Sequence, residues 1–227
     1  MSKTAKIAEI FDSVQGEGLY IGVRQLFIRF CGCNLLCDYC DTAFDKGKEY
    51  TVDELVKEIQ SYDTQSIHSV SLTGGEPLLH YEFLQLLLPE LKKQNIKIYL
   101  ETNGTLPKPL ESVIDNIDII AMDFKLDSSA KIGNLYSKHD EFLAIATQNK
   151  TETYAKLVFD ETLKDFEINE SVELAQKYNI PVILQPKMNG NDIGVSHDKI
   201  LSVFDEFTAK YHNTRLIGQV HKFFDIR

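Results

Sequence analysis

The sequence predicts an α/β fold built on an open, partial barrel of parallel strands, and three observations support this prediction. Short apolar segments with strand character alternate with amphipathic helical segments, which is the pattern of parallel strands joined by right-handed crossovers. About six such strands can be distinguished, whereas a closed eight-stranded barrel typically needs ~250 residues and this chain has 227. Polar or glycine-rich motifs follow several strands, at the end where sites in such folds lie.

The expected elements follow one another in a regular order. Each expected strand is a short apolar run, and these runs cover residues 25–31, 69–73, 97–102, 117–124, 154–159, 181–185 and 214–220. Helices are expected from residue 52 onward and over residues 81–94, 140–147, 167–178 and 198–210. Thr51 is the expected cap of the first helix, because Asp53 and Glu54 follow in its first turn. Residues 126–137 are polar without clear periodicity and predict a surface loop.

Length and composition exclude several classes of protein. The length suits a single domain over residues 1–227, and 43% apolar residues with 10% aromatics exclude wholesale disorder. No apolar run approaches the ~18–20 residues of a membrane span, and a net charge of −10 disfavours a polyanion held by bulk charge. We therefore expect neither a membrane nor nucleic acid as a partner. The first residues, MSKTAK, lack the apolar core of a secretion signal, which favours a cytoplasmic location.

All four cysteines fall between positions 31 and 40, which predicts a metal or redox site rather than a disulfide framework. Cys33, Cys37 and Cys40 form a CxxxCxxC pattern. Three thiolates on one short loop can hold three irons of a 4Fe–4S cluster and leave the fourth iron open to a substrate or cofactor. The alternative is a zinc site with Cys31 as fourth ligand. We favour the cluster, and we expect Cys31 to be a small buried residue at a strand end.

Two motifs end neighbouring strands. In Gly74-Gly75-Glu76-Pro77 the glycines allow close approach of a ligand, and Glu76 can accept hydrogen bonds from an ammonium group. Glu101, in ETNG at 101–104, can bind the two hydroxyls of a ribose. Alone, GGEP could be an ordinary turn, and for ETNG a solvated turn at the strand end would be the preferred interpretation. The functional interpretation therefore depends on both motifs occurring together with the CxxxCxxC pattern.

Arg29 and the QGEG motif at 15–18 are further candidates for the site. Arg29 shares the face of Phe27 and Cys31 by the period of two residues in a strand. A guanidinium that points into a barrel needs an anion, which is either a substrate carboxylate or an internal Asp or Glu. The QGEG motif precedes the expected first strand, and its alternative interpretation is a flexible loop.

These motifs together closely resemble those of the 7-carboxy-7-deazaguanine synthases, radical S-adenosylmethionine enzymes of queuosine and 7-deazapurine biosynthesis. CxxxCxxC with Tyr39 before the last cysteine, and GGEP, are features of the superfamily. QGEG before the strand, RFCGC before the cluster loop, CDT after it and the HK pair near the C-terminus distinguish the family, and the resemblance covers nearly the whole chain. It implies a homodimer with a shortened, partial barrel.

The resemblance also implies a reaction. The reduced cluster cleaves S-adenosylmethionine to a 5′-deoxyadenosyl radical, which takes a hydrogen from C6 of 6-carboxy-5,6,7,8-tetrahydropterin. Magnesium-assisted ring contraction with loss of ammonia gives 7-carboxy-7-deazaguanine, so the enzyme would be a carbon–nitrogen lyase. An electron donor such as a flavodoxin or ferredoxin would reduce the cluster.

The resemblance assigns roles by position. It implies cluster ligands at Cys33, Cys37 and Cys40 and a magnesium ligand at Thr42. It implies S-adenosylmethionine contacts at Tyr39, Asp41, Gly75, Glu76, Glu101, Asp123, Lys125 and Gln185. It implies substrate contacts at Val14, Gln15, Gly16, Glu17, Arg29, Thr73, His221 and Arg227, with Arg29 facing the substrate carboxylate and Glu17 the aminopyrimidinone edge. Asp123-Phe124-Lys125 departs from the family, since many members have Ser-Pro-Lys there.

Two other functions share part of this pattern. An enzyme that makes a glycyl radical on a partner protein has the same CxxxCxxC, but QGEG and the HK pair argue against it. A zinc-binding interaction module would contain no sulfide.

We predict that Cys33→Ala, Cys37→Ala and Cys40→Ala each abolish cluster assembly, whereas Cys31→Ala retains it, because three ligands leave one iron open. Iron, zinc and sulfide analysis after anaerobic purification measures the outcome. Loss of the cluster in Cys31→Ala, together with stoichiometric zinc, would instead support the zinc site.

Overall fold

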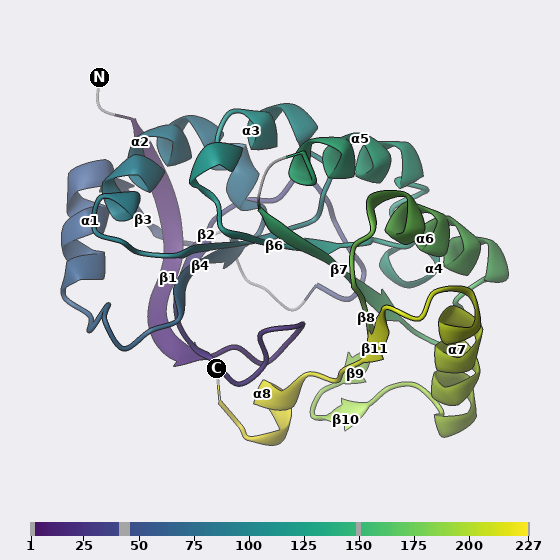
Figure 1. Cartoon of the computed structure of the whole chain (residues 1–227). Coiled ribbons are helices and arrows are strands. Elements are labelled where there is room, and N and C mark those ends of the chain that lie inside the picture. Colours follow the sequence, from purple (N-terminus) through teal and green to yellow (C-terminus); the bar gives the residue numbers. More distant parts are fainter. Residues whose placement is uncertain (1–2, 41–45, 149–150, 227) are drawn as a thin grey trace.

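The described residues form a sheet of nine strands in the order β11-β8-β7-β6-β5-β4-β2-β1-β3 (Figure 1). The computed structural model describes residues 3–40, 46–148 and 151–226. The strands of this sheet are β1 (Thr4–Val14), β2 (Arg24–Phe30), β3 (Lys48–Thr51), β4 (Ser69–Gly74), β5 (Ile98–Thr102), β6 (Ile119–Asp123), β7 (Glu152–Phe159), β8 (Val182–Pro186) and β11 (Thr214–Leu216). A separate hairpin pairs β9 (Met188–Asn189) with β10 (Asp192–Ile193).

The sheet is parallel from β2 to β11 and antiparallel where β1 pairs with β2 and β3. Within the described residues β3 and β11 are its two edges, and no pairing joins them. The predicted fold class, an open and mostly parallel β/α barrel, is therefore confirmed.

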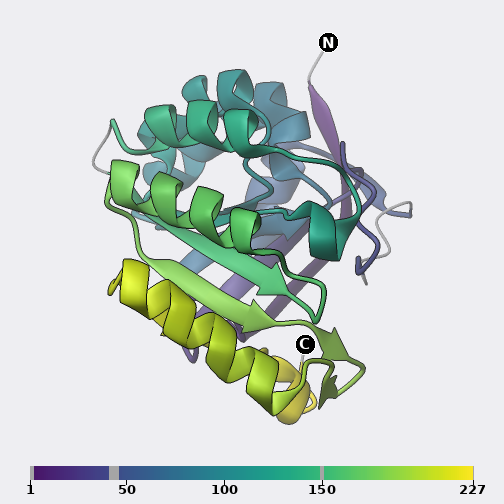
Figure 2. The same ribbon diagram turned by 90° about the vertical axis from the view of Figure 1, so that its right-hand side faces the viewer.

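The helices lie mainly on one face of this sheet. They are α1 (Val52–Gln60), α2 (Tyr81–Lys92), α3 (Pro107–Glu111), α4 (Asp127–Ala130), α5 (Tyr136–Ala146), α6 (Asp165–Tyr178), α7 (His197–Lys210) and α8 (Val220–Phe223), with short 3-10 turns at Pro77–His80 and Ile114–Asn116. Figure 2 shows α5 and α6 over the sheet and α7 alongside its last strands, whereas α8 lies on the other side near the C-terminus. No helix in the described ranges has both the length and the apolar character needed to cross a membrane.

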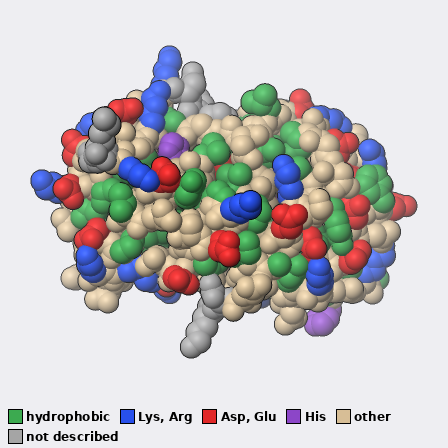
Figure 3. Space-filling view, turned by 90° about the horizontal axis from the view of Figure 1, so that it is seen from above, with side chains coloured by type: hydrophobic (Ala, Val, Ile, Leu, Met, Phe, Trp, Pro, Cys, Tyr) green, Lys and Arg blue, Asp and Glu red, His purple; other side chains and the backbone are tan. Residues whose placement is uncertain are grey.

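The main apolar core lies between the sheet and these helices. Alternate strand residues, such as Leu26 and Ile28 of β2 and Leu72 of β4, are completely buried and belong to the same apolar cluster as Leu84 and Leu88 of α2. The outer surface of the helix layer carries interspersed acidic and basic side chains with scattered apolar ones (Figure 3). The helices therefore seal one face of the sheet, and the other face is left to build the site.

The first predicted helix and its cap are confirmed. The Thr51 hydroxyl accepts a hydrogen bond from the backbone N–H of Glu54 at 3.3 Å, and the Glu54 carboxylate accepts one from the Thr51 N–H at 2.8 Å. This reciprocal capping box satisfies two donors that would otherwise lack partners at the start of the helix.

Several expectations about the elements were wrong or incomplete. The strand β1 was not predicted, because a register shift between Ile7 and Glu9 interrupts the alternation on which the prediction relied. Residues 126–137 are not a surface loop, since α4 lies there and Ser128 and Ser129 are almost completely buried. The final strand ends at Leu216 rather than at residue 220, and α8 begins soon afterwards.

The burial of α4 has a specific cause. The hydroxyl of Ser129 donates to the carbonyl of Val158 at 2.9 Å, and the N–H of Ser128 donates to the Glu167 carboxylate at 2.8 Å. Buried polar groups of this kind are tolerated when they have hydrogen-bond partners. The polar sequence therefore led to the wrong prediction of an exposed loop.

Candidate functional site

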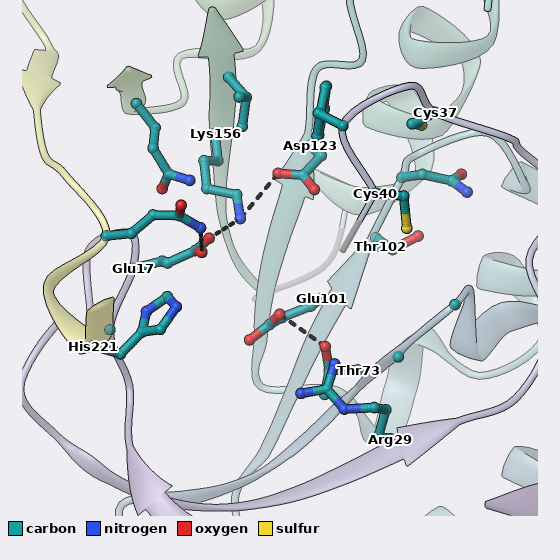
Figure 4. A pocket seen from close by; sticks show the side chains of 18 of the residues that line it. Glu17, Arg29, Cys37, Cys40, Thr73, Glu101, Thr102, Asp123, Lys156 and His221 are labelled. Carbon is teal, nitrogen blue, oxygen red and sulfur yellow. Dashed lines mark hydrogen bonds and ion pairs between the residues drawn. The ribbon is translucent and has the colours of Figure 1, made fainter. Parts of the chain in front are cut away.

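A cavity of about 590 Å³ opens on the face of the sheet opposite the main helix layer, at the carboxyl ends of the parallel strands. Its wall combines these strand ends with the end of β1, the cysteine loop and the C-terminal segment (Figure 4). The predicted location of the site at the strand ends is thus where the cavity lies.

Successive parallel strands each place a polar side chain on this wall. In order across the sheet they are Arg29 of β2, Thr73 of β4, Glu101 of β5, Asp123 of β6, Lys156 of β7 and Gln185 of β8. Their neighbours along each strand point into the apolar core, because side chains alternate between the two faces. Arg29 and Thr73 are register partners, as are Asp123 and Lys156, so the polar residues form a continuous rim.

The three cysteines of the CxxxCxxC pattern line this cavity, and Cys31 does not. The Cys31 side chain is buried, with its thiol 3.5 Å from the carbonyl of Lys46. Burial raises the pKa of the Cys33 and Cys37 thiols. Within the described ranges no three His, Cys, Asp or Glu side chains are close enough together to hold a metal ion, so the three thiols share a wall without converging.

The donor set fits a 4Fe–4S cluster with one open iron better than a zinc site, because three soft sulfur ligands face the cavity and the fourth thiol is turned away. Gln185 gives a second indication that a ligand belongs here. Its side chain is only 2% exposed, it lines the cavity, and its Oε1 accepts no hydrogen bond from the described residues. A buried polar atom without a partner normally has one when the site is filled. Asp41 and Thr42 lie outside the described residues.

The cysteine loop is anchored to the turn after β5 and to helix α4. The Asn103 amide donates to Asn34 Oδ1 at 2.9 Å, and the Asn34 amide donates to the hydroxyl of Thr105 at 2.8 Å. Further along the loop, the N–H of Asp38 donates to the carbonyl of Ala130 at 3.0 Å. The ETNG turn after β5 therefore holds the start of the loop, which the sequence did not predict for Asn103.

Glu76, which the resemblance assigns to S-adenosylmethionine, lies behind the cavity wall. It is completely buried and does not line the cavity. Its Oε1 accepts from the N–H of Leu78 at 3.1 Å and from the hydroxyl of Thr102 at 2.9 Å, and its Oε2 accepts from the N–H of Asn103 at 2.8 Å. Burial raises the pKa of Glu76 to about 7 despite these three donors. Glu76 thus connects the GGEP turn to the end of β5, and the backbone of Gly75 is what the turn presents to the cavity.

Gln15 and Glu101 form the polar floor of the cavity. The Gln15 amide donates to Glu101 Oε1 at 2.9 Å and to Gln25 Oε1 at 3.0 Å, while its own oxygen accepts from the N–H of Glu17 at 3.1 Å. The hydroxyl of Thr73 donates to Glu101 Oε2 at 2.9 Å. The QGEG motif is therefore held against β5 and is not a flexible loop in this structure.

A chain of alternating charges crosses the cavity (Figure 4). Lys156 Nζ contacts Glu17 Oε2 and lies 3.3 Å from Asp123 Oδ1. Asp123 Oδ2 in turn is 2.8 Å from Lys125 Nζ, which donates to the hydroxyl of Tyr39 at 3.2 Å. The four charged side chains are between 13% and 21% exposed, so each depends on its neighbours for compensation.

The pKa values in this chain follow from the pairing. Burial by itself would raise the pKa of Glu17, but Lys156 outweighs burial and lowers that pKa to about 2. The pKa of Asp123 is also lowered, because Lys125 and Lys156 outweigh its burial. Burial lowers the pKa of both lysines, but the carboxylates more than offset it, so both pKa values end above the usual range. All four groups are therefore charged at neutral pH.

The C-terminal segment closes one side of the site. The N–H of Val220 donates to the carbonyl of Gly16 at 2.9 Å, and the Gln219 amide donates to Glu17 Oε1. His221 lines the cavity and leaves no room for a side chain at position 16, where a Cβ would lie 2.2 Å from its Nδ1. Val14 also lines the cavity, and Arg227 lies outside the described residues.

Several cavity residues were missed by the sequence analysis, and among them are Lys156, Glu9 and Gln219. Lys156 had a recognisable signal, since it is the one charged residue in the expected strand 154–159 and its position has the same parity as Tyr154 and Val158. Glu9 and Gln219 had none, because β1 and the contact between the two ends of the chain were not predicted.

The chain belongs to the radical S-adenosylmethionine enzymes, since the family model described as "Radical SAM superfamily" matches residues 27–185. Within that superfamily the chain belongs to the 7-carboxy-7-deazaguanine synthase family. It is 38% identical to the 7-carboxy-7-deazaguanine synthase of Geobacter sulfurreducens and 31% identical to that of Methanothermobacter thermautotrophicus, with 98% of this chain and 98% of each relative covered.

Solved structures show the same fold. The QueE protein of Escherichia coli matches with a TM-score of 0.64 and 22% identity, covering 96% of this chain and 95% of that chain. Streptococcus suis SuiB bound to S-adenosylmethionine matches with a TM-score of 0.60 and 17% identity, covering 84% of this chain and 49% of that chain.

We predict that Gly75→Ala disrupts the cysteine loop. A Cβ at position 75 would lie 1.8 Å from the carbonyl oxygen of Gly32. The nearest atoms are all backbone atoms of Gly32 and Cys33, so no flexible side chain can move aside. Overpacking of this kind typically lowers the free energy of unfolding by about 1–3 kcal/mol. Urea unfolding measures the loss, and cluster content after reconstitution should fall with it. Gly218→Ala is the matched control, because its Cβ meets only Phe223 at 3.7 Å. Equal stability of the two variants would contradict the close approach.

Proposed function

We propose that this chain is a 7-carboxy-7-deazaguanine synthase, a carbon–nitrogen lyase that converts 6-carboxy-5,6,7,8-tetrahydropterin to 7-carboxy-7-deazaguanine with loss of ammonia. The observation that carries the proposal is the joint placement of three thiols and a charged polar rim in one cavity, in a chain whose full-length relatives bear that name. A glycyl-radical-activating enzyme would need to admit a protein loop, whereas this cavity is partly closed by the C-terminal segment.

The cofactors would divide the cavity between them. Cys33, Cys37 and Cys40 would hold the 4Fe–4S cluster, and, when bound, the cluster supplies the electron that cleaves S-adenosylmethionine and starts the radical reaction. The S-adenosylmethionine contacts are proposed at Tyr39, Asp41, Gly75, Glu101, Asp123, Lys125 and Gln185, with Glu76 acting through the turn that it fixes. Gln185 suits this role because its buried amide oxygen has no partner among the described residues.

The substrate would bind across the cavity from the cluster. Val14, Gln15, Gly16, Glu17, Thr73, His221 and Arg227 are proposed to surround the pterin, and Arg29 to receive its carboxylate. Glu17 is suited to accept hydrogen bonds from the N–H groups of an aminopyrimidinone edge, because its carboxylate stays ionised beside Lys156. Since the QGEG segment and the C-terminal segment contact each other, the bound substrate would be shielded from water on that side.

Several finer features belong to the same proposal. Magnesium would be bound by Thr42, since a hydroxyl beside substrate oxygens and water suits a hard cation. The enzyme would act as a cytoplasmic homodimer, reduced by a donor such as a flavodoxin or ferredoxin. A single domain over residues 1–227 is supported by the one sheet that takes strands from Thr4 to Leu216.

Anaerobic turnover of the reconstituted enzyme tests the function directly. The enzyme, S-adenosylmethionine, a chemical reductant and 6-carboxy-5,6,7,8-tetrahydropterin are incubated, and the product is identified by mass. We expect 7-carboxy-7-deazaguanine. The absence of conversion by an enzyme with a full, reducible cluster would reject the assignment.

We predict that Arg29→Lys weakens substrate binding by roughly 1.5–3 kcal/mol, because lysine keeps the charge but loses the two-pronged geometry that matches a carboxylate. Binding of S-adenosylmethionine and its uncoupled cleavage should persist. Equilibrium binding of both ligands to the same variant measures the two effects.

The matched control for Arg29 is Glu9→Gln. Glu9 Oε2 lies 3.6 Å from Arg29 Nε, so the structure supplies an internal anion that the sequence had offered as the alternative. If Arg29 serves the substrate, removing the Glu9 charge should leave substrate affinity unchanged or improve it. If Arg29 serves only as the partner of Glu9, the two variants will lose stability alike and substrate affinity will not distinguish them.

We predict that Thr42→Ala raises the magnesium requirement without changing cluster content, because it removes a hard oxygen ligand and leaves the thiols intact. Magnesium titration of turnover and iron analysis measure the two quantities. Thr42→Ser, which keeps the hydroxyl, is the control. Superimposable magnesium titrations for Thr42→Ala and the wild type would assign Thr42 a role in the loop alone.

A further inference from the structure

Lys156 is not among the proposed cofactor or substrate contacts, yet two mostly buried carboxylates converge on its ammonium group. It comes from the middle of β7, its side chain is 14% exposed, and it lies between the carboxylates of Glu17 and Asp123 (Figure 4). A lysine in that position forfeits much of its hydration, which the two carboxylates must offset.

We propose that Lys156 is the positioning residue for Glu17: it holds the Glu17 carboxylate ionised and oriented toward the cavity, so that Glu17 can receive the hydrogen-bond donors of the substrate. This inference rests on the proposed function, because it concerns the edge of the substrate that Glu17 would bind.

The geometry supports this role in two ways. Glu17 belongs to a turn rather than to a strand, so its side chain is oriented by what it contacts: Lys156 at Oε2 and the Gln219 amide at Oε1. Lys156, by contrast, is fixed by the register of β7 with β6, where it is paired with Asp123. The rigid strand thus orients the less constrained turn, and a third contact to Asp123 at 3.3 Å keeps the ammonium group between the two acids.

The charges that surround Glu17 explain why Lys156 is required. Asp123 of β6 and Glu101 of β5 are acidic, and Tyr99 of β5 and Tyr154 of β7 are uncharged at neutral pH, since burial raises both of their pKa values. His221 of α8 makes a smaller contribution that also lowers the pKa of Glu17. Without Lys156, Glu17 would lie buried among carboxylates, and burial would then raise its pKa.

The test compares Lys156→Met, Lys156→Gln and Lys156→Arg with the wild type. Binding of 6-carboxy-5,6,7,8-tetrahydropterin to the reconstituted enzyme is measured between pH 5.5 and 8.5, and each variant's dissociation constant is divided by that of the wild type to cancel the titration of the ligand. For Lys156→Met we expect a ratio of about 10 to 100 that grows as the pH falls, because Glu17 then takes up a proton and ceases to accept. Lys156→Arg should restore a ratio near one at every pH.

A second measurement makes the test independent of the substrate. Removing Lys156 leaves the buried Glu17 with a raised pKa in the folded protein, whereas Asp123 keeps Lys125 as its partner. The folded state then binds more protons than the unfolded state, so stability is lost as the pH rises. The midpoint of thermal unfolding of Lys156→Met, relative to the wild type, should therefore be lower at pH 8 than at pH 5.5. Lys156→Gln removes the charge but keeps a donor, so it should show the same trend with a smaller loss and a better chance of folding.

Lys177→Met is the matched control. Lys177 also pairs with an aspartate, Asp140 at 2.6 Å, but on the outer surface of α6, where its side chain is 51% exposed. This variant should leave the dissociation constant and its pH dependence unchanged.

The possible outcomes separate the two proposals. Two results would overturn the role of Lys156. In the first, the wild type binds the pterin and the dissociation constant of Lys156→Met equals that of the wild type at every pH. In the second, Lys156→Met binds the pterin normally but no longer binds S-adenosylmethionine. If the wild type itself neither binds nor converts the pterin, the proposed function fails. The pH dependence of thermal unfolding then still tests whether Lys156 keeps Glu17 ionised. If the midpoint of Lys156→Met differs from that of the wild type by the same amount at pH 5.5 and pH 8, the role of Lys156 is rejected.

Discussion

Charge compensation within a largely buried cavity is the interaction on which this site depends. Glu17, Lys156, Asp123 and Lys125 are each mostly withdrawn from water, and each is tolerable only because the next one carries the opposite sign. Strand register sets the middle pair of this series, since it places Asp123 of β6 beside Lys156 of β7, and Glu17 and Lys125 join them from the segments that follow β1 and β6. A site built in this way holds fixed charges ready for ligands without waiting for water to reorganise.

Close backbone approach is the second constraint, and it explains the form of the GGEP motif. The first turn after β4 lies so near the cysteine loop that position 75 has no space for a Cβ. Glu76 then fixes this turn to the end of β5 through three hydrogen bonds. The cysteine loop, the GGEP turn and the ETNG turn are therefore one connected unit, in which a change at any member would be transmitted to the thiols.

The sequence predicted the fold class because most of the strands and helices can be recognised from local sequence patterns. The parallel strands are short apolar runs between helices with clear apolar stripes, and the Thr51 cap was predictable from Glu54 three residues later. Predictions failed where local pattern and environment disagree. The register shift in β1 breaks the alternation, and the buried serines of α4 find partners on segments distant in the sequence, Val158 and Glu167.

The sequence by itself determined the chemistry that this protein can hold: three cysteines at a fixed spacing, glycines before a helix and an arginine at an inward position of a strand. These are local properties, set by spacing along one segment. Only the tertiary structure decided which groups meet. It turned Glu76 away from the cavity, gave Arg29 the partner Glu9 and placed Lys156 between Glu17 and Asp123. Such contacts join residues up to 139 positions apart, and they depend on strand order and register, which no single segment encodes.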